Sequence, residues 1–399
     1  GDVRTSIAGA LAERNAFDGR AFAVVTSGED RPEVLDLSDC AHVPREDLAA
    51  AIGRLVRDGL RVLRLGHAGR CFGPEAAREL AAAAEEGGAG SIFALSLGGA
   101  YLLKDEDYAA IVAGACRSLS SIELRACKGV GTAFCAALMK HYGVAGSASL
   151  LELQLEHVDT PTVAVESLLA APPNVFKNLR SLRLDHVASI TDAAVSSLLR
   201  AASGSLEALS LHHVAVTDES LEALRQTDTG RLRSLSLRGL RDVTPAALEA
   251  LFTPGLDGLH SPPALRRLEL ASLHEETVTD HVVGAAAAAS APEGLGSGAG
   301  LVRLDVGGSS SLTDLSMEHV ARHCAGSLQE LDVGYCHCIS DKGLGYLVSV
   351  AGKQLRNISL WGCAQITDNF LDGHARAGPG SGLDVEGVWM RKSGPALQP

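Results

Sequence analysis

Apolar residues recur along the chain in a fixed pattern, L-x-x-L-x-L-x-x-C or a close variant, in which x is mostly polar. Leu328, Leu331, Val333 and Cys336 form one copy. Eleven other segments align with it, and their closing residues are Cys40, Ala68, Ala100, Cys127, Val158, Val187, Val214, Leu240, Leu273, Ser309 and Cys363. Successive closing residues are 26 to 36 residues apart. Internal repetition therefore organises the chain.

Each copy combines a strand pattern with a helix pattern. Leucines at the second and third positions alternate with other residues, as in a β-strand with one buried face. Between copies stand sequences such as Ile190-Thr191-Asp192, whose side chains can accept hydrogen bonds from the free N–H groups that open a helix. Amphipathic stretches then predict helices, for example over 193–201, 220–225 and 317–323. The sequence predicts an α/β fold, a leucine-rich-repeat solenoid (horseshoe) with a concave parallel β-sheet, convex helices and about twelve repeats.

The composition agrees with a stacked aliphatic core. Of the 399 residues, 46% are hydrophobic but only 4% are aromatic, so Leu, Val, Ile and Ala must fill the interior. No apolar run reaches the roughly 18–20 residues that span a membrane. The nine cysteines are odd in number and scattered, which favours reduced thiols in the cytosol or nucleus. A net charge of −13 disfavours binding to nucleic-acid phosphates and favours protein partners.

Three regions are expected along the chain. Residues 1–30 form an N-terminal capping segment, 31–375 the solenoid, and 376–399 a C-terminal cap or tail. The chain starts at Gly1 rather than Met, which predicts that the sequence begins inside a longer protein. Insertions are expected at 81–90, 253–263 and 285–300, where Ala, Gly, Glu or Pro accumulate. They form either permissive surface loops or a docking flap.

The repeat resembles the cysteine-containing subfamily of leucine-rich repeats, in which the motif is followed by I-T-D. Cys40, Cys127, Cys336 and Cys363 match the family's cysteine, whereas Val158, Val187 and Val214 replace it with another apolar residue. The resemblance covers residues 34 to about 375. Because this subfamily is typical of F-box proteins and other ubiquitin-ligase substrate receptors, it implies a protein-binding role.

The end of the array resembles one family more closely. Residues 360–374 (Leu-Trp-Gly-Cys-Ala-Gln-Ile-Thr-Asp-Asn-Phe-Leu-Asp-Gly-His) precede the segment Leu383-Asp384-Val385-Glu386-Gly387. This is similar to the fungal leucine-rich-repeat subunit of global-genome nucleotide-excision repair, in which such a segment leads into a short final strand. The resemblance implies a nuclear protein that partners a chromatin-remodelling ATPase and serves as substrate receptor for a cullin-type ubiquitin ligase.

Candidate chemistry is sparse. The chain contains no P-loop, no G-x-G-x-x-G after a strand, no H-E-x-x-H and no G-x-S-x-G. Cys336 and Cys338, with Cys363 one repeat later, could bind zinc or could be core thiols. His157, His186 and His213 precede the closing residue in three successive repeats; they could bind metal, sense pH, or satisfy backbone groups of the following turn. We expect no catalytic residue, cofactor or metal site.

The residues that face outward from the predicted strands are better candidates. Those two and four positions before each closing residue form two ladders of neighbours about 4.8 Å apart. In the middle repeats they give a mixed-charge strip of Arg125, Glu156, Arg183, Asp185, His212 and Arg238. These side chains form either cross-strand ion pairs or part of a partner's footprint.

The late repeats carry an acidic patch and two aromatic residues. Glu269, Asp305, Glu330 and Asp332 would repel one another if stacked, which favours a basic partner segment. Tyr335 and Trp361 lie on adjacent late strands, and such residues often carry binding energy. Trp361 could instead pack under the C-terminal segment that contains Trp389.

The function expected from these observations is a non-enzymatic protein-interaction scaffold. We expect a substrate-recognition subunit of a cullin-type ubiquitin ligase or of a nucleotide-excision-repair damage-recognition complex, located in the nucleus or cytoplasm. Its partners would be proteins, including a ligase adaptor or repair ATPase, within a hetero-complex that contains one copy of the chain. Association with DNA would be indirect, and no membrane is involved. The alternatives are a direct DNA-binding repair subunit and a structural subunit of a large assembly.

Overall fold

Every copy of the sequence repeat contains one short β-strand, as the alternation of apolar and polar positions predicts. The structure is a computed structural model. The residues it describes are 22, 26, 32–38, 43–87, 91–142, 149–158, 174–187, 189–255, 261–274, 276–291, 300–352, 354–367, 369–370 and 382–387. The chain forms two compact units, unit 1 over Gly1–Leu206 and unit 2 over Glu207–Pro399.

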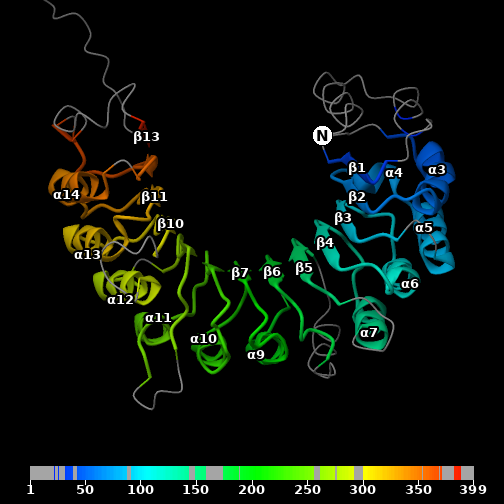
Figure 1. Cartoon of the computed structure of the whole chain (residues 1–399), viewed down its shortest axis with the longest axis horizontal. Coiled ribbons are helices and arrows are strands. Elements are labelled where there is room, and N and C mark those ends of the chain that lie inside the picture. Colours follow the sequence, from blue (N-terminus) through cyan, green and yellow to red (C-terminus); the bar gives the residue numbers. More distant parts are fainter. Residues whose placement is uncertain are drawn as a thin grey trace, which may run out of the picture. The chain divides into compact units, whose positions relative to one another are not determined.

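In unit 1 the strands pair in parallel with their neighbours in chain order (Figure 1). They are β1 (Val34–Leu37), β2 (Val62–Leu65), β3 (Ala94–Gly98), β4 (Ser121–Arg125), β5 (Glu152–Glu156) and β6 (Ser181–Asp185). The register places equivalent motif positions side by side, for example Ile122 beside Leu153. The repeats are therefore stacked without a shift.

Unit 2 has the same arrangement of parallel strands. Its strands are β7 (Ala208–His212), β8 (Ser234–Ser236), β9 (Arg267–Glu269), β10 (Arg303–Asp305), β11 (Glu330–Asp332), β12 (Asn357–Ser359) and β13 (Asp384–Glu386). The first twelve strands of the chain coincide with the twelve sequence copies. Strand β13 pairs with β12 and is the short final strand that the C-terminal resemblance implies.

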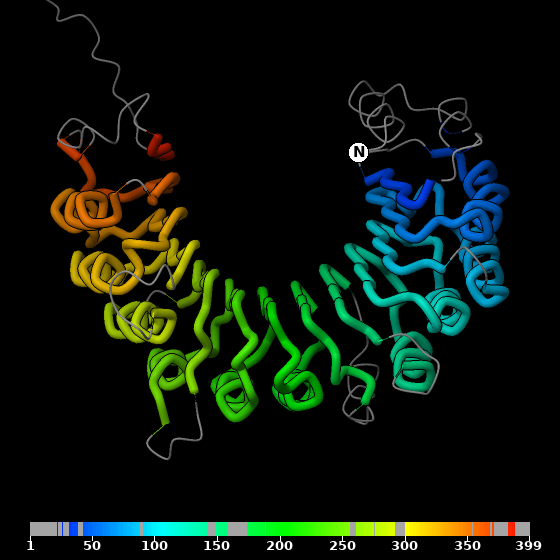
Figure 2. The backbone as a smooth tube through the Cα atoms, in the orientation of Figure 1, coloured from blue at the N-terminus to red at the C-terminus, as the bar shows by residue number. Residues whose placement is uncertain are grey.

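The helices pack on one side of the strands in each unit (Figures 1 and 2). Unit 1 contains α3 (Arg45–Arg57), α4 (Ala68–Cys71), α5 (Pro74–Glu86), α6 (Asp105–Ala115), α7 (Thr132–His141) and α9 (Asp192–Ala201). Unit 2 contains α10 (Asp218–Arg225), α11 (Pro245–Phe252), α12 (Asp280–Ser290), α13 (Asp314–Cys324) and α14 (Asp341–Ala351). The helices predicted at 193–201, 220–225 and 317–323 are confirmed. No helix among the described residues is long and apolar enough to cross a membrane.

The motif leucines and closing residues form the core between strands and helices. Leu331 is 2% exposed and Cys336 is fully buried. The closing thiols also donate hydrogen bonds, because the Sγ atoms of Cys127, Cys336 and Cys363 lie 3.3, 3.5 and 3.1 Å from carbonyl oxygens one repeat earlier. Burial raises the pKa of the Cys336 thiol to about 12. These are structural thiols that tie one repeat to the preceding one.

Aspartates at the starts of helices in unit 2 tie successive repeats together, an arrangement absent from the sequence-based expectations. The Thr or Ser before each helix of this unit does cap it, as predicted; the hydroxyl of Thr279, for example, accepts from Val282 N. The aspartate that follows reaches the next repeat instead. Asp314 accepts from the N–H and hydroxyl of Ser340, at 2.8 and 2.7 Å. The same bonds join Asp218 to Thr244, Asp280 to Thr313 and Asp341 to Thr367.

The residue before the closing position adopts the left-handed backbone conformation in ten successive repeats. These residues are Gly99, Ala126, His157, His186, His213, Gly239, Ser272, Gly308, Tyr335 and Gly362, with φ from 48° to 83°. The turn directs their N–H groups toward the next repeat; the N–H of Ala126, for example, donates to the Glu156 carbonyl at 2.7 Å. The ladder of backbone hydrogen bonds thus continues beyond the strands.

Parts of two of the expected insertions are helical. Residues 81–86 belong to α5, in which Ala81, Ala83 and Ala84 are buried, and 285–290 belong to α12. The expectation of a surface loop was wrong for 81–86, because alanine is a strong helix former and its small side chain suits close helix packing. For the alanine run at 285–289, a helix end was one of the two expectations. Residues 88–90, 256–260 and 292–299 lie outside the described residues, as do most of the predicted capping segments 1–30 and 376–399.

Candidate functional site

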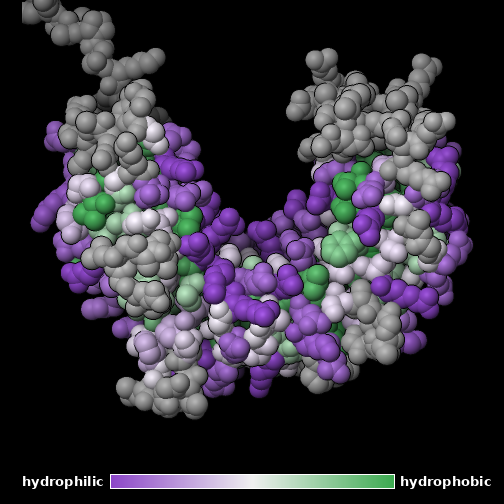
Figure 3. Space-filling model, viewed as in Figure 1, coloured by the Kyte–Doolittle hydropathy of each residue, from purple (hydrophilic) through white to green (hydrophobic). Residues whose placement is uncertain are grey.

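The solvent side of the strands, opposite the helices, is here called the sheet face. It is predominantly hydrophilic in both units (Figure 3). Three residues of each longer strand point to this face, at the first, third and fifth positions. The candidates named from the sequence come from the third and fifth positions, apart from Glu330. The first position, six residues before each closing residue, was otherwise missed although the period-two pattern extends to it.

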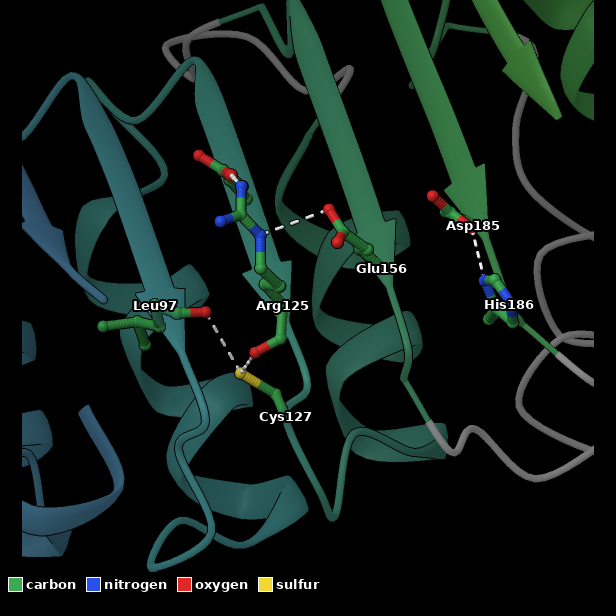
Figure 4. A network of polar contacts seen from close by, with 7 residues as sticks. Leu97, Arg125, Cys127, Glu156, Asp185 and His186 are labelled. Carbon is green, nitrogen blue, oxygen red and sulfur yellow. Dashed lines mark hydrogen bonds and ion pairs between the residues drawn. The ribbon is translucent and has the colours of Figure 1, made fainter. Parts of the chain in front are cut away.

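In unit 1 the mixed charges pair with one another. Arg125 lies 2.8 Å from Glu123. It also lies 3.2 Å from Glu156 of the neighbouring strand (Figure 4). Arg125 remains more than half exposed, and such pairs contribute little to stability. Arg183 is half-buried, and its Nε has no hydrogen-bond partner among the described residues. Cross-strand ion pairing therefore accounts for Arg125, and a partner's footprint over these residues stays a prediction.

Unit 2 carries a chain of polar contacts across five consecutive strands. His212 Nε2 lies 2.5 Å from the Ser236 hydroxyl, which donates to Glu269 at 2.9 Å. Arg303 Nε lies 3.3 Å from Glu269, and another nitrogen of its guanidinium lies 2.8 Å from Glu330. Arg303 occupies the first strand position and was not a predicted site residue. It separates two carboxylates that the sequence analysis expected to repel each other.

Asp305 lies in register between Glu269 and Asp332 but is buried. It is 3% exposed, accepts a hydrogen bond from Gly307 N, and lies 3.5 Å from the Arg238 guanidinium. Burial raises the pKa of Asp305; the carboxylates of Asp332 and Glu269 add to the rise, while Gly307 and Arg238 oppose it. Burial is the largest of these effects. His212, at the start of the polar chain, is also buried.

A groove of about 160 Å³ opens on the sheet face of unit 2. Its side chains come from four adjacent strands, β10 to β13, and include Arg303, Glu330, Asp332, Asn357, Ser359 and Glu386. Of the predicted acidic patch, Glu330 and Asp332 line it. Glu386 is exposed and makes no side-chain hydrogen bond or ion pair within the described part of the chain. The groove therefore has three carboxylates and one guanidinium.

Tyr335 and Trp361 lie just beyond the carboxyl ends of β11 and β12. Their exposed fractions are 60% and 48%, so much of each ring is open to solvent. The Tyr335 N–H donates to the Trp361 carbonyl at 2.5 Å. The Tyr335 ring covers Gly362, where any Cβ would lie 2.5 Å from the ring, and Trp361 contacts Gly387 in the same way. A glycine therefore lies against each of these aromatic residues, and much of each side chain remains exposed to solvent.

The predicted site residues are divided between the units. Unit 2 contains Glu269, Asp305, Asp332, Tyr335, Trp361, His212 and Arg238, whereas Arg125 and Arg183 belong to unit 1. Packing of Trp361 under Trp389 concerns a residue outside those described. The groove residues Asn357 and Glu386 were not predicted, although the first-position ladder and the strand-like 383–387 segment carry the signal for them.

The histidine and cysteine clusters show no metal-binding geometry. Within the described ranges, no three His, Cys, Asp or Glu side chains come together as metal ligands would. Cys338 is exposed while Cys336 is buried. The His157 and His186 rings stack with centroids 4.1 Å apart, and Asp185 lies 2.6 Å from His186 Nδ1 (Figure 4). The backbone N–H of His157, not its ring, satisfies the carbonyl of Asp185.

Comparison with known proteins identifies the fold. No family model matches the chain, and no curated protein matches its sequence. The structure of the Rad7 and Elc1 complex in yeast matches with a TM-score of 0.70 at 16% identity, over 96% of this chain and 87% of that chain. A leucine-rich repeat-containing protein of Legionella pneumophila, LegL7, gives a TM-score of 0.23 at 13% identity, over 68% of this chain and 65% of that chain, and adds nothing to the argument. The chain is a leucine-rich-repeat solenoid whose fold is similar to that of Rad7.

Proposed function

We propose that this chain is a protein-interaction scaffold that recognises a partner through the sheet face of unit 2. One observation carries the proposal: two exposed aromatic residues, Tyr335 and Trp361, lie beside an acidic groove on a face that no described helix covers. Aromatic residues of this kind are enriched among those that dominate binding energy. Repeat arrays generally use such extended faces for binding rather than catalysis.

The partners that we propose follow from the sequence resemblance and from the fold. Rad7, a yeast nucleotide-excision-repair leucine-rich-repeat protein, was crystallised in complex with Elc1. We infer that this chain is likewise a non-enzymatic subunit of a hetero-complex, acting as the substrate-recognition subunit of a cullin-type ubiquitin ligase or of a repair damage-recognition complex in the nucleus or cytoplasm. Direct DNA binding is less favoured because phosphates would face Glu330, Asp332 and Glu386.

Affinity capture of the full chain from native extract, with mass spectrometry, tests the role. We expect a ubiquitin-ligase adaptor or a repair ATPase to be recovered in stoichiometric amounts. Stoichiometric assembly into a different machine, with neither of these present, would contradict the proposal.

Trp361→Ala tests the surface in the same experiment. The variant should capture the partner about 30-fold more weakly, since a central aromatic contact is commonly worth about 2 kcal/mol or more. Tyr346→Ala is the matched control, because Tyr346 is 49% exposed but lies on helix α14. Equal capture by the two variants, both with unchanged unfolding midpoints, would exclude the sheet face as the binding surface.

A further inference from the structure

The shape of the groove in unit 2 follows from the lengths of its side chains. On β12, Asn357 and Ser359 form a low floor, and they lie in register between Glu330 and Asp332 on β11 and Asp384 and Glu386 on β13. Because adjacent strands are about 4.8 Å apart, the acidic residues of β11 and β13 stand about 10 Å apart. Two acidic walls therefore flank a short-chained floor.

Two glycines keep the surface beside Asp332 open. A Cβ at Gly334 would lie 3.1 Å from Asp332 Oδ1 and 3.7 Å from the Cβ of Trp361. A Cβ at Gly307 would lie 3.6 Å from the same carboxylate oxygen. Any larger residue at these positions would fill the space between the carboxylate and the aromatic residues. The groove is thus continuous with the surface that leads to Trp361.

The charges of the groove are unbalanced. Arg303 is its only cation within the described residues, and its guanidinium already contacts Glu269 and Glu330. Asp332 accepts one hydrogen bond, from Gly334 N at 2.9 Å, and Glu386 accepts none from a described residue.

The dimensions select the kind of occupant. A groove of about 160 Å³ is small, which suits one long side chain rather than a folded surface. A guanidinium matches two carboxylates, because its planar fork donates to both, and it also stacks on aromatic rings. Lysine would supply the charge without the fork.

We propose that the groove of unit 2 binds an arginine side chain presented by an extended, basic segment of the partner protein. The guanidinium lies between Asp332 and Glu386, above Asn357 and Ser359, and the segment continues over Trp361 and Tyr335. This inference rests on the proposed scaffold function and specifies the chemistry of its partner.

Short Gly/Ser peptides that carry arginine at alternate positions serve as the probe. Their binding to the full chain is measured by fluorescence anisotropy, beside identical peptides that carry lysine or citrulline, the neutral isostere of arginine. We expect arginine peptides to bind at least about tenfold more tightly than citrulline peptides, with lysine peptides between them. Equal binding of arginine and citrulline peptides, or none of arginine peptides at about 1 mM, would overturn the proposal.

Charge-removing variants locate the site. The Asp332→Asn, Glu386→Gln double variant should bind arginine peptides about tenfold more weakly or worse, whereas Glu318→Gln, on the exposed face of α13, should bind as the wild type does. Unchanged unfolding midpoints establish that all variants are folded. Equal arginine-peptide affinity of the double variant and the wild type would refute the site.

The native partner separates this inference from the scaffold function. If Trp361→Ala loses the partner while the double variant retains it, the arginine site is wrong and the scaffold function stands. If extract capture yields neither proposed partner while arginine peptides bind as expected, the groove does bind arginine and the proposed role of the chain is wrong.

Discussion

Asp280→Ala is expected to lower the free energy of unfolding by about 2–4 kcal/mol. Its carboxylate accepts hydrogen bonds from the N–H of Thr313 at 3.0 Å, from the Thr313 hydroxyl at 2.7 Å, and from the Ser316 hydroxyl. Removing the carboxylate leaves these donors without their acceptor at the junction of α12 and α13. Urea denaturation followed by circular dichroism measures the loss.

Two further variants identify the cause. Asp280→Asn keeps an acceptor and should lose less than Asp280→Ala, and Glu318→Ala, at an exposed helical position, should change stability by less than about 0.5 kcal/mol. If Asp280→Ala is as stable as Glu318→Ala, the aspartate ties do not hold the repeats together.

The stabilisation by Asp280 should also depend on pH. Burial raises the pKa of this carboxyl, but hydrogen bonds from Ser316 and Thr313 outweigh it and leave the pKa below its usual value. A lowered folded-state pKa contributes stability above the unfolded pKa, near about 4, which is lost as the pH falls through the folded value. The difference between the wild type and Asp280→Asn should therefore shrink upon acidification below about pH 4.

Gly114→Ala should destabilise the chain by about 1–3 kcal/mol although alanine is the better helix former. Gly114 is buried in α6, where a Cβ would lie 2.3 Å from the Ala81 carbonyl oxygen of α5. This atom belongs to the backbone, so the clash can be relieved only by moving one helix. Thermal unfolding of the purified variant measures the effect.

Gly53→Ala is the matched control within the same unit. Gly53 is also a buried helical glycine, in α3, but the atom its Cβ would meet first is the flexible carboxylate tip of Glu79, at 2.9 Å. The tip can swing aside, so helix propensity should dominate and the variant should gain up to about 1 kcal/mol. Equal effects at the two positions would mean that close helix packing does not set the stability of this unit.

The strands and helix starts were predictable because they depend on local rules. Period-two alternation located the first twelve strands, and the Thr or Ser that begins each predicted cap in unit 2 accepts its hydrogen bond as expected. The aspartate ties were not predicted, since each joins residues 26 or more positions apart. A sequence pattern shows that Asp314 can cap a helix. Only the stacking of repeats shows that its carboxylate accepts hydrogen bonds from the next repeat.

The candidate site could be predicted only in part, because some of its features also depend on contacts between repeats. Tyr335, Trp361 and Asp332 could be assigned to the sheet face from the repeat alignment. Asp305 is buried, and Arg303 lies between Glu269 and another carboxylate, because of packing between strands β8 to β11. An alignment of the third and fifth strand positions does not show this packing. The acidic residues on both sides of Asn357 and Ser359 could be recognised only once β13 was placed. The sequence signal for β13 is the short 383–387 segment, which is not a full copy of the repeat.

Site-specific photo-crosslinking tests the central claim most directly, that partners bind the sheet face of unit 2. The photo-reactive residue p-benzoylphenylalanine replaces Tyr335, beside the groove, or Tyr346, on the exposed side of α14. Each purified partner complex is then irradiated. We expect an efficient crosslink to the partner from position 335 and little or none from position 346. Crosslinking from position 346 alone would contradict this claim.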